Sequence, residues 1–151
     1  MTKFKIKATN NIKEIYKLKK GIELKRPILG CNIPAGFPSP AQDYIEGTLD
    51  LNEYLIMHPN STFFVSVIGT SMVNAGINPG DILLVDRSIS PLDENIIIAI
   101  IDGELTVKKL NVINGVYWLL PENNNYSPIR IYEGDSFSIW GVVTYIIHKV
   151  F

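Results

Sequence analysis

Short apolar stretches separated by turn residues fill the chain from residue 62 to its end. The stretches are rich in β-branched and aromatic residues, a pattern typical of strands in an antiparallel sheet. Two dipeptides between them, Asp102-Gly103 and Asn114-Gly115, have the composition of two-residue hairpin turns. We therefore expect a mostly β, antiparallel body with strands at 62–68, 82–85, 95–101, 104–110, 116–120, 129–132 and 137–148.

The pattern before residue 62 differs, because apolar residues recur there at helical spacing. The segment 11–20 is predicted to form a short amphipathic helix that Gly21 would end. The residues on its apolar face are Ile12, Ile15, Tyr16 and Lys19.

A second helical segment is expected over 43–57, in two pieces broken at Gly47. Asp50 would cap the second piece, and its buried side would hold Leu51, Tyr54 and Leu55. The preceding stretch, 27–40, contains four prolines and two glycines, so it is predicted to be an extended, accessible linker.

The charge of the chain is unevenly distributed, although the formal net charge is only −1. Residues 1–35 hold nine basic and two acidic residues, a net charge of +7, whereas residues 36–151 hold five basic and thirteen acidic residues, a net charge of −8. The sequence thus joins a basic arm to an acidic body. Two interpretations stay open: the arm lies against its own domain, or it binds nucleic acid or a partner until it is released.

Composition excludes several classes of protein. The chain is 46% hydrophobic and 19% charged, which is not the composition of a disordered chain. A single cysteine, Cys31, rules out a disulfide framework and a multi-cysteine zinc site, and with two histidines no metal or other cofactor is expected. The longest apolar run, 96–101, is too short to span a bilayer, and the N-terminus does not read as a secretory signal. We expect a soluble, cytoplasmic protein without membrane association.

The segment 69–81 is the most informative for chemistry, because Ser71 follows the expected end of a strand within a few residues. A hydroxyl exposed there, beside backbone N–H groups, is a candidate nucleophile with an oxyanion site. From spacing alone, the simpler interpretation is that Ser71 caps a helical turn over 72–76.

A nucleophilic serine needs a base, and the residues offer two kinds. A Ser-His-Asp triad would have to recruit His58 or His148, and neither is well placed in the sequence. A lysine whose pKa is lowered by burial can also accept the serine proton. Strand 104–110 carries two candidates, Lys108 and Lys109, and strand alternation alone does not choose between them.

Several motifs in order and at matching spacing carry a family resemblance. They are AGFPSPAQDY at 35–44, LDLN at 49–52 with His58-Pro59, GTSM at 69–72 with Gly76-Ile77 and Gly80-Asp81, DGELTVKKL at 102–110, and YSPI at 126–129 followed by WGVV at 140–143. Over about three quarters of its length the chain thereby resembles the LexA-type Ser-Lys self-cleaving peptidases, and in particular their UmuD-type branch.

The resemblance implies specific roles for residues of this chain. Ser71 matches the nucleophile and Lys108 the general base, and the scissile bond would be Ala35–Gly36. The backbone N–H groups of Thr70 and Ser71 would line the oxyanion site. Residues 1–35 would then be a basic arm removed by self-cleavage, and residues 36–151 an LexA/UmuD-like antiparallel β peptidase domain with a short helical N-terminal segment.

The resemblance also implies a function and partners. It implies a homodimer whose cleavage is stimulated by a RecA filament on single-stranded DNA during the SOS response to DNA damage. The shortened form would be an accessory subunit of a Y-family, error-prone translesion polymerase. Direct contact of the arm with DNA stays open.

Two features depart from the UmuD-type pattern. The bond is Ala-Gly, as in LexA repressors, where the UmuD type often has Cys-Gly, and the 35-residue arm is longer than usual for that type. Two alternatives are therefore kept: a non-catalytic dimeric β module, and a truncated LexA- or phage-type repressor whose basic arm touches DNA.

Overall fold

The computed structural model describes residues 2–4, 12–17, 26–29 and 45–151. Contacts divide the chain into two units, and each is described by itself. The larger unit comprises Met1–Lys19 and His58–Phe151, and the smaller comprises Lys20–Met57. The predicted boundary at residue 35 and residues 30–40 of the predicted linker lie outside the described residues. The linker prediction is wrong for 27–29, which belong to a paired strand.

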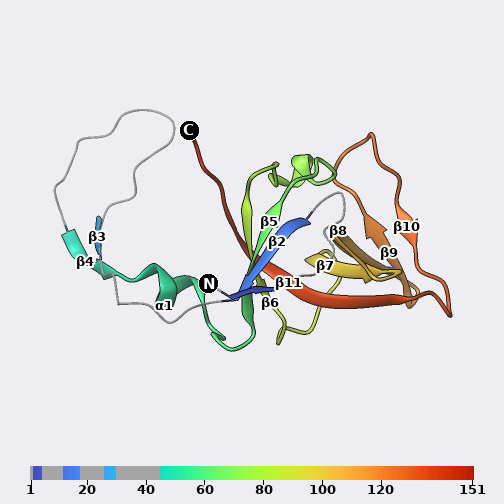
Figure 1. Ribbon diagram of the computed structural model, residues 1–151, viewed down its shortest axis with the longest axis horizontal. Coiled ribbons are helices and arrows are strands. Elements are labelled where there is room, and N and C mark those ends of the chain that lie inside the picture. The colour runs from blue at the N-terminus through green and yellow to red at the C-terminus, as the bar shows by residue number, and fades with distance from the viewer. Residues whose placement is uncertain (1, 5–11, 18–25, 30–44) are drawn as a thin grey trace. The chain divides into compact units, whose positions relative to one another are not determined.

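A single antiparallel sheet forms the larger unit, as Figure 1 shows. Within the described residues its order is β1-β2-β5-β6-β11-β7-β8-β9-β10. The strands are β1 (Thr2–Phe4), β2 (Ile12–Lys17), β5 (Thr62–Val67), β6 (Ile82–Asp86), β7 (Ile96–Ile101), β8 (Glu104–Ile113), β9 (Val116–Leu120), β10 (Ile129–Arg130) and β11 (Phe137–Ile147). The predicted mostly β, antiparallel body is thus confirmed, with each expected strand present and shifted at most by a few residues.

Both predicted hairpins are present and use the expected turn chemistry. Asp102 and Gly103 have φ values of 51° and 80°, and Asn114 and Gly115 have values of 50° and 78°. Positive φ at both central residues defines the type I′ turn, which Asn, Asp and Gly tolerate best. The two turns fold β7, β8 and β9 into an antiparallel meander in which Ile97 pairs with Lys108.

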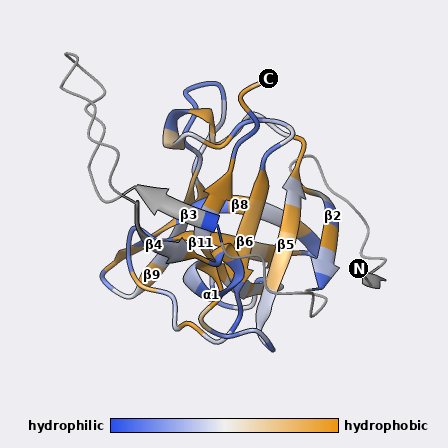
Figure 2. Ribbon diagram, turned by 90° about the vertical axis from the view of Figure 1, so that its left-hand side faces the viewer, coloured by the Kyte–Doolittle hydropathy of each residue, from blue (hydrophilic) through white to orange (hydrophobic). Residues whose placement is uncertain are grey.

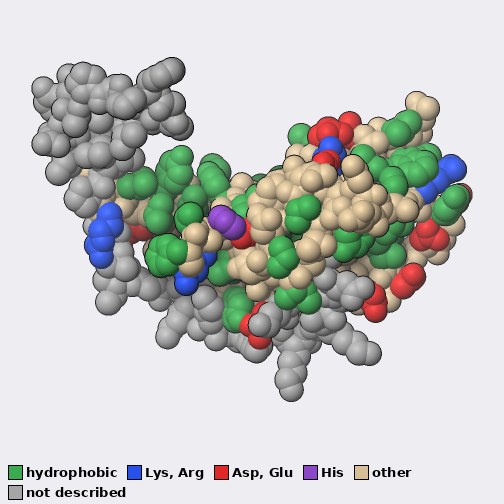
Figure 3. All heavy atoms as spheres, turned by 90° about the horizontal axis from the view of Figure 1, so that it is seen from above, with side chains coloured by type: hydrophobic (Ala, Val, Ile, Leu, Met, Phe, Trp, Pro, Cys, Tyr) green, Lys and Arg blue, Asp and Glu red, His purple; other side chains and the backbone are tan. Residues whose placement is uncertain are grey.

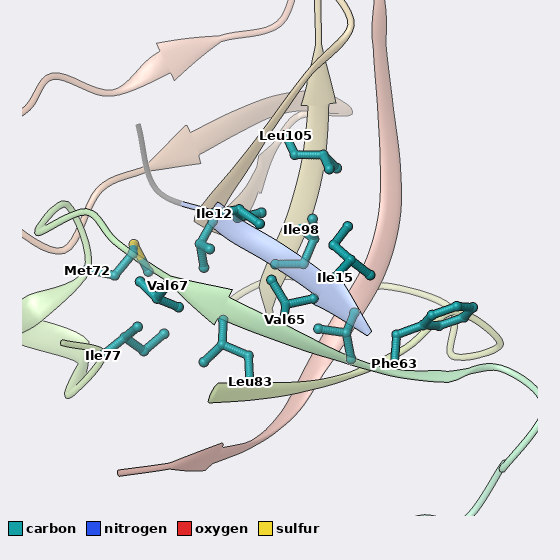
Figure 4. Packing of buried hydrophobic residues seen from close by; sticks show 12 residues of the cluster. Ile12, Ile15, Phe63, Val65, Val67, Met72, Ile77, Leu83, Ile98 and Leu105 are labelled. Atoms are coloured by element: carbon teal, nitrogen blue, oxygen red, sulfur yellow. The ribbon is translucent and has the colours of Figure 1, made fainter. Parts of the chain in front are cut away.

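The sheet is curved, so that strands far apart in its order share one core. Strand β11 carries register shifts between Ile139 and Gly141 and between Val143 and Tyr145, and such bulges bend a strand. Inside the curve, β2, β5 and β6 pack against β7 and β8 (Figure 4). Figure 2 shows that the residues of β5 and β6 are largely hydrophobic. The buried cluster is Ile12, Ile15, Phe63, Val65, Val67, Met72, Ile77, Leu83, Val85, Ile98, Leu105 and Val107.

The helix predicted over 11–20 is wrong, because Ile12–Lys17 is strand β2 and pairs with β5. Ile12 and Ile15 are nevertheless on one buried face, at 1% and 2% exposure. A register shift between Ile12 and Glu14 explains this, since one extra residue turns the period of two into a spacing of three. The bulge therefore gives the two buried isoleucines the spacing that is expected in a helix.

The smaller unit contains β3 (Arg26–Leu29), β4 (Ile45–Leu49) and α1 (Leu51–Leu55). The second piece of the predicted helix is confirmed, and Asp50 caps it by accepting a 2.9 Å hydrogen bond from the Asn52 N–H. The first piece is wrong, because 45–49 is a strand that pairs with β3. The predicted buried side is also wrong, since Leu51 and Tyr54 are exposed.

In the part of the chain that the structure describes, none of the helices has the length and apolar character to cross a bilayer. Acidic and basic side chains of the described residues are scattered over the face seen in Figure 3. Large hydrophobic side chains also reach the surface, and among the most exposed are Met57, Leu92, Val150 and Phe151.

Gly141 on β11 provides a test of the curved sheet. A Cβ atom at this position would lie 2.6 Å from Val85 Cγ1, inside the buried cluster, so we expect Gly141→Ala to lower the free energy of unfolding by about 1–3 kcal/mol. The exposed Ser138→Ala on the same strand is the control, with a change expected within about 0.5 kcal/mol. Chemical denaturation measures both, and equal stabilities of the two variants would contradict this packing.

Candidate active site

Ser71 lies in a short loop that begins where β5 ends. The loop contains a 3₁₀ turn at Val73–Ala75 and is closed by Gly76, whose φ of 78° suits glycine. Met72 and Ile77 are fully buried in the core on either side of this turn. These two anchors fix the loop on the sheet, and Ser71 itself is only 1% exposed.

The capping interpretation of Ser71 is wrong. The residue at the N-cap position of the 3₁₀ turn is Met72, and no side chain caps that turn. The Ser71 hydroxyl instead accepts a 3.1 Å hydrogen bond from the amine of Lys108. The side chain is therefore in contact with a candidate base.

Lys108 reaches Ser71 from the middle of β8, where its neighbours are apolar. It pairs across the sheet with Ile97, which is fully buried. The lysine residue is 5% exposed, and its amine also donates to Thr106 Oγ1 and to the Val107 carbonyl oxygen, each at 3.0 Å. These contacts position Nζ and leave little room for water around it.

Burial lowers the pKa of the Lys108 amine from its ordinary 10.5 to about 8. A substantial fraction of the amine is then neutral slightly above physiological pH, and a neutral amine has the lone pair that accepts a proton. The pair therefore has the composition, contact and pKa required for general-base activation of a hydroxyl.

Lys109 points the other way and makes a different set of contacts. Its amine forms ion pairs with Glu122 at 2.5 Å and with Glu94 at 3.3 Å. The hydrogen bond to Glu122 and the one to Glu94 raise its pKa, the opposite of the shift at Lys108. The structure thus places the first lysine of the pair beside Ser71 and leaves the second charged.

A strap at 122–126 holds the serine loop, and sequence reasoning missed it. Glu122 donates its N–H to the Ser71 carbonyl and accepts from the Asn74 N–H, both at 2.8 Å. Asn123 donates to the Thr70 carbonyl oxygen at 2.9 Å, and Tyr126 is hydrogen-bonded to the Thr70 hydroxyl at 2.9 Å. The two bonds of Glu122 join backbone atoms only, so side-chain identity gave no signal for them, whereas Asn123 and Tyr126 bond through their side chains.

The two histidines that a triad would need are held by other carboxylates. His58 Nδ1 is 2.6 Å from Asp86, and His148 Nδ1 is 2.6 Å from Asp81. Burial alone would raise the pKa of Asp86, but hydrogen bonds from Ser88, His58 and Ser61 outweigh it and lower that pKa to about 2. One His–Asp pair lies at each end of β6, and each has the geometry of a structural hydrogen bond.

Among the described residues, no group of three or more His, Cys, Asp and Glu side chains is arranged to hold a metal ion. The carbonyl oxygens of Thr70 and Ser71 accept hydrogen bonds from the strap, whereas the oxyanion role of their N–H groups stays a prediction. The predicted scissile bond, Ala35–Gly36, lies outside the described residues, and so does Cys31.

Comparisons with known proteins give a family and several relatives for this chain. The profile of the Peptidase S24-like family matches residues 27–144. Protein SamA of Salmonella typhimurium is 44% identical over 128 residues, which cover 85% of this chain and 89% of SamA. Protein MucA of Escherichia coli is 44% identical over 115 residues, covering 75% of this chain and 77% of MucA.

A more distant similarity extends to a repressor. The LexA repressor of Acidithiobacillus ferrooxidans is 39% identical over 120 residues, which cover 78% of this chain but only 58% of the repressor. The family match and the relatives together show that this chain belongs to the Peptidase S24-like family, the self-cleaving serine peptidases of the LexA and UmuD type.

Proposed function

We propose that this protein cuts its own Ala35–Gly36 bond, with Ser71 as the nucleophile and Lys108 as the general base. The observation that carries the proposal is the 3.1 Å contact between the Lys108 amine and the Ser71 hydroxyl in a buried site. The contact joins two residues 37 positions apart in the chain, so it is a tertiary contact between the serine loop and β8.

The reaction follows from the two groups. Neutral Lys108 takes the hydroxyl proton while Ser71 Oγ bonds to the Ala35 carbonyl carbon, which forms a tetrahedral oxyanion. The N–H groups of Thr70 and Ser71 would stabilise that charge. The Lys108 ammonium then gives the proton to the Gly36 nitrogen as the peptide bond breaks. Water, deprotonated by the same amine, releases Ala35 from the ester and regenerates the serine.

The products would be a basic peptide of residues 1–35 and an acidic body of residues 36–151. We propose, from membership in the family, that the protein acts in the SOS response, and that a RecA filament on single-stranded DNA stimulates the cleavage. The shortened form would serve as a homodimeric accessory subunit of a Y-family translesion polymerase. A cytoplasmic location belongs to the same proposal.

Replacement of the nucleophile tests the cleavage directly. Incubation of the purified protein at pH near 10 should release a fragment that starts at Gly36, whereas Ser71→Ala should lower the rate by about a thousandfold or more. Mass spectrometry of the products measures the cut position and the rate. Equal cleavage by the Ser71→Ala protein would remove Ser71 from the mechanism.

The two neighbouring lysines allow a matched comparison. Lys108→Met should abolish cleavage and also stabilise the fold at pH 7 by about 1–3 kcal/mol, because it removes a buried cation. Lys109→Met removes only two partly exposed ion pairs, so it should slow cleavage less than about tenfold. Thermal unfolding and cleavage rates of both variants separate loss of chemistry from loss of fold, and similar rates in the two would argue against Lys108 as the base.

The lowered pKa of Lys108 predicts the pH dependence. The neutral amine is the active form, so the rate should rise about tenfold per pH unit below about 8 and level off above it. The stabilising effect of Lys108→Met should shrink as the pH rises from about 8 towards 10.5, because the folded lysine is then neutral while the unfolded one is still charged. A cleavage rate that is flat from pH 6 to pH 10 would contradict the proposed base.

A further inference from the structure

Strand β2 precedes the proposed cut in the sequence, yet it belongs to the core of the larger unit. Ile12 and Ile15 are 1% and 2% exposed and lie in the cluster with Val65 and Val67 of β5 (Figure 4). Burial this complete is usual for core residues and unusual for a segment that is simply shed. The first 35 residues therefore supply a structural strand to the domain from which cleavage would separate them.

The backbone of β2 completes the sheet at the edge of β5. Its residues pair with β5 from Ile12 opposite Val67 to Lys17 opposite Phe63. In the sheet order of the described residues, only β1 lies beyond β2, and β1 also precedes the proposed cut. Loss of both strands would turn β5 into an edge strand with unpaired N–H and C=O groups, which proteins generally avoid exposing.

Strand β2 also supports the candidate active site from within the core. The cluster that holds Ile12 and Ile15 contains Met72, which follows the nucleophile, and Val107, which precedes the base. Strand β5 runs directly into the serine loop, and the end of β5 nearest that loop is the end that pairs with Ile12. The strand that would be cut away thus shares its buried cluster with the sequence neighbours of both catalytic groups.

The distribution of charge also favours binding of the excised peptide to the rest of the protein. The arm of residues 1–35 carries a net charge of +7 and the remainder of the chain carries −8. Opposite charges of this size attract two separate molecules and speed their encounter at moderate ionic strength. Cleavage of a bond removes the covalent link but leaves this attraction and the buried contacts in place.

We propose that the edge of β5 is a strand-docking site whose ligand is residues 12–17, and that the excised peptide stays bound there after cleavage. The site works by strand addition: the ladder with β5 gives affinity, and the pockets for Ile12 and Ile15 give specificity. Cleavage then converts an internal strand into an exchangeable ligand, and release of that ligand becomes a separate step that uncovers β5. The proposal depends on the proposed function only for the place of the cut.

The test uses a cut that does not depend on the protein's own chemistry. The recognition sequence of a site-specific protease is placed between residues 35 and 36 of full-length Ser71→Ala protein, which is then cut with that protease. Native mass spectrometry and size exclusion at physiological salt should find the 35-residue peptide and the body together in equal amounts. Elution of the wild-type peptide apart from the body would overturn the proposal, while leaving the proposed self-cleavage untouched.

Two variants in the same background test the specificity of the site. Ile12→Asp with Ile15→Asp should release most of the peptide after the cut, because each change places a charge in an apolar pocket. Lys17→Gln, on the same strand but exposed, should leave the peptide bound. Equal retention by both variants would show that the buried isoleucines do not hold the peptide.

Hydrogen exchange provides a measurement that needs no change in the strand. The amides of β5 in the cut protein, with its wild-type strand, should keep the protection that they have in the uncut protein. Loss of protection over 62–67 after the cut would show that β2 has left, and it would overturn the proposal even if the core variants fail to fold.

Discussion

A charged amine is costly to bury, and the candidate active site is built around that cost. Lys108 occupies a position on β8 beside Ile97, where an apolar side chain would suit the core better. The same burial that disfavours the cation lowers its pKa to about 8 and makes it a base. The rest of the structure brings one hydroxyl to this amine, through the loop after β5 and the strap around Glu122 that holds it.

The sequence predicted the sheet well wherever the chemistry is local. Turn residues such as Asp102-Gly103 require no distant partner, so both hairpins and the strands between them follow from the sequence. Strand β2 was mistaken for a helix because its bulge gives Ile12 and Ile15 a spacing of three. A bulge depends on how a strand pairs with its partner, so the sequence of the strand alone does not predict it.

The candidate site was likewise predictable only where it depends on local sequence. The position of Ser71 after a strand was visible in the sequence, but alternation left Lys108 and Lys109 equivalent, and only the family motif favoured the first. The structure separates them by contact: one amine meets a hydroxyl in the core and the other meets Glu122 and Glu94. The strap was not predicted, because Glu122 bonds to the loop through backbone atoms and because Asn123 and Tyr126 contact Thr70 from 53 and 56 residues away in the chain.

The measurement closest to the central claim is the pKa of the Lys108 amine itself. Nuclear magnetic resonance of side-chain-labelled lysine in the uncleaved Ser71→Ala protein can follow each amine through a pH titration, with Lys109 as an internal reference. We expect a midpoint near 8 for Lys108 and one above the ordinary value for Lys109. A midpoint near 10.5 for Lys108 would mean that the amine is charged at every pH at which the protein works, and it would contradict the account.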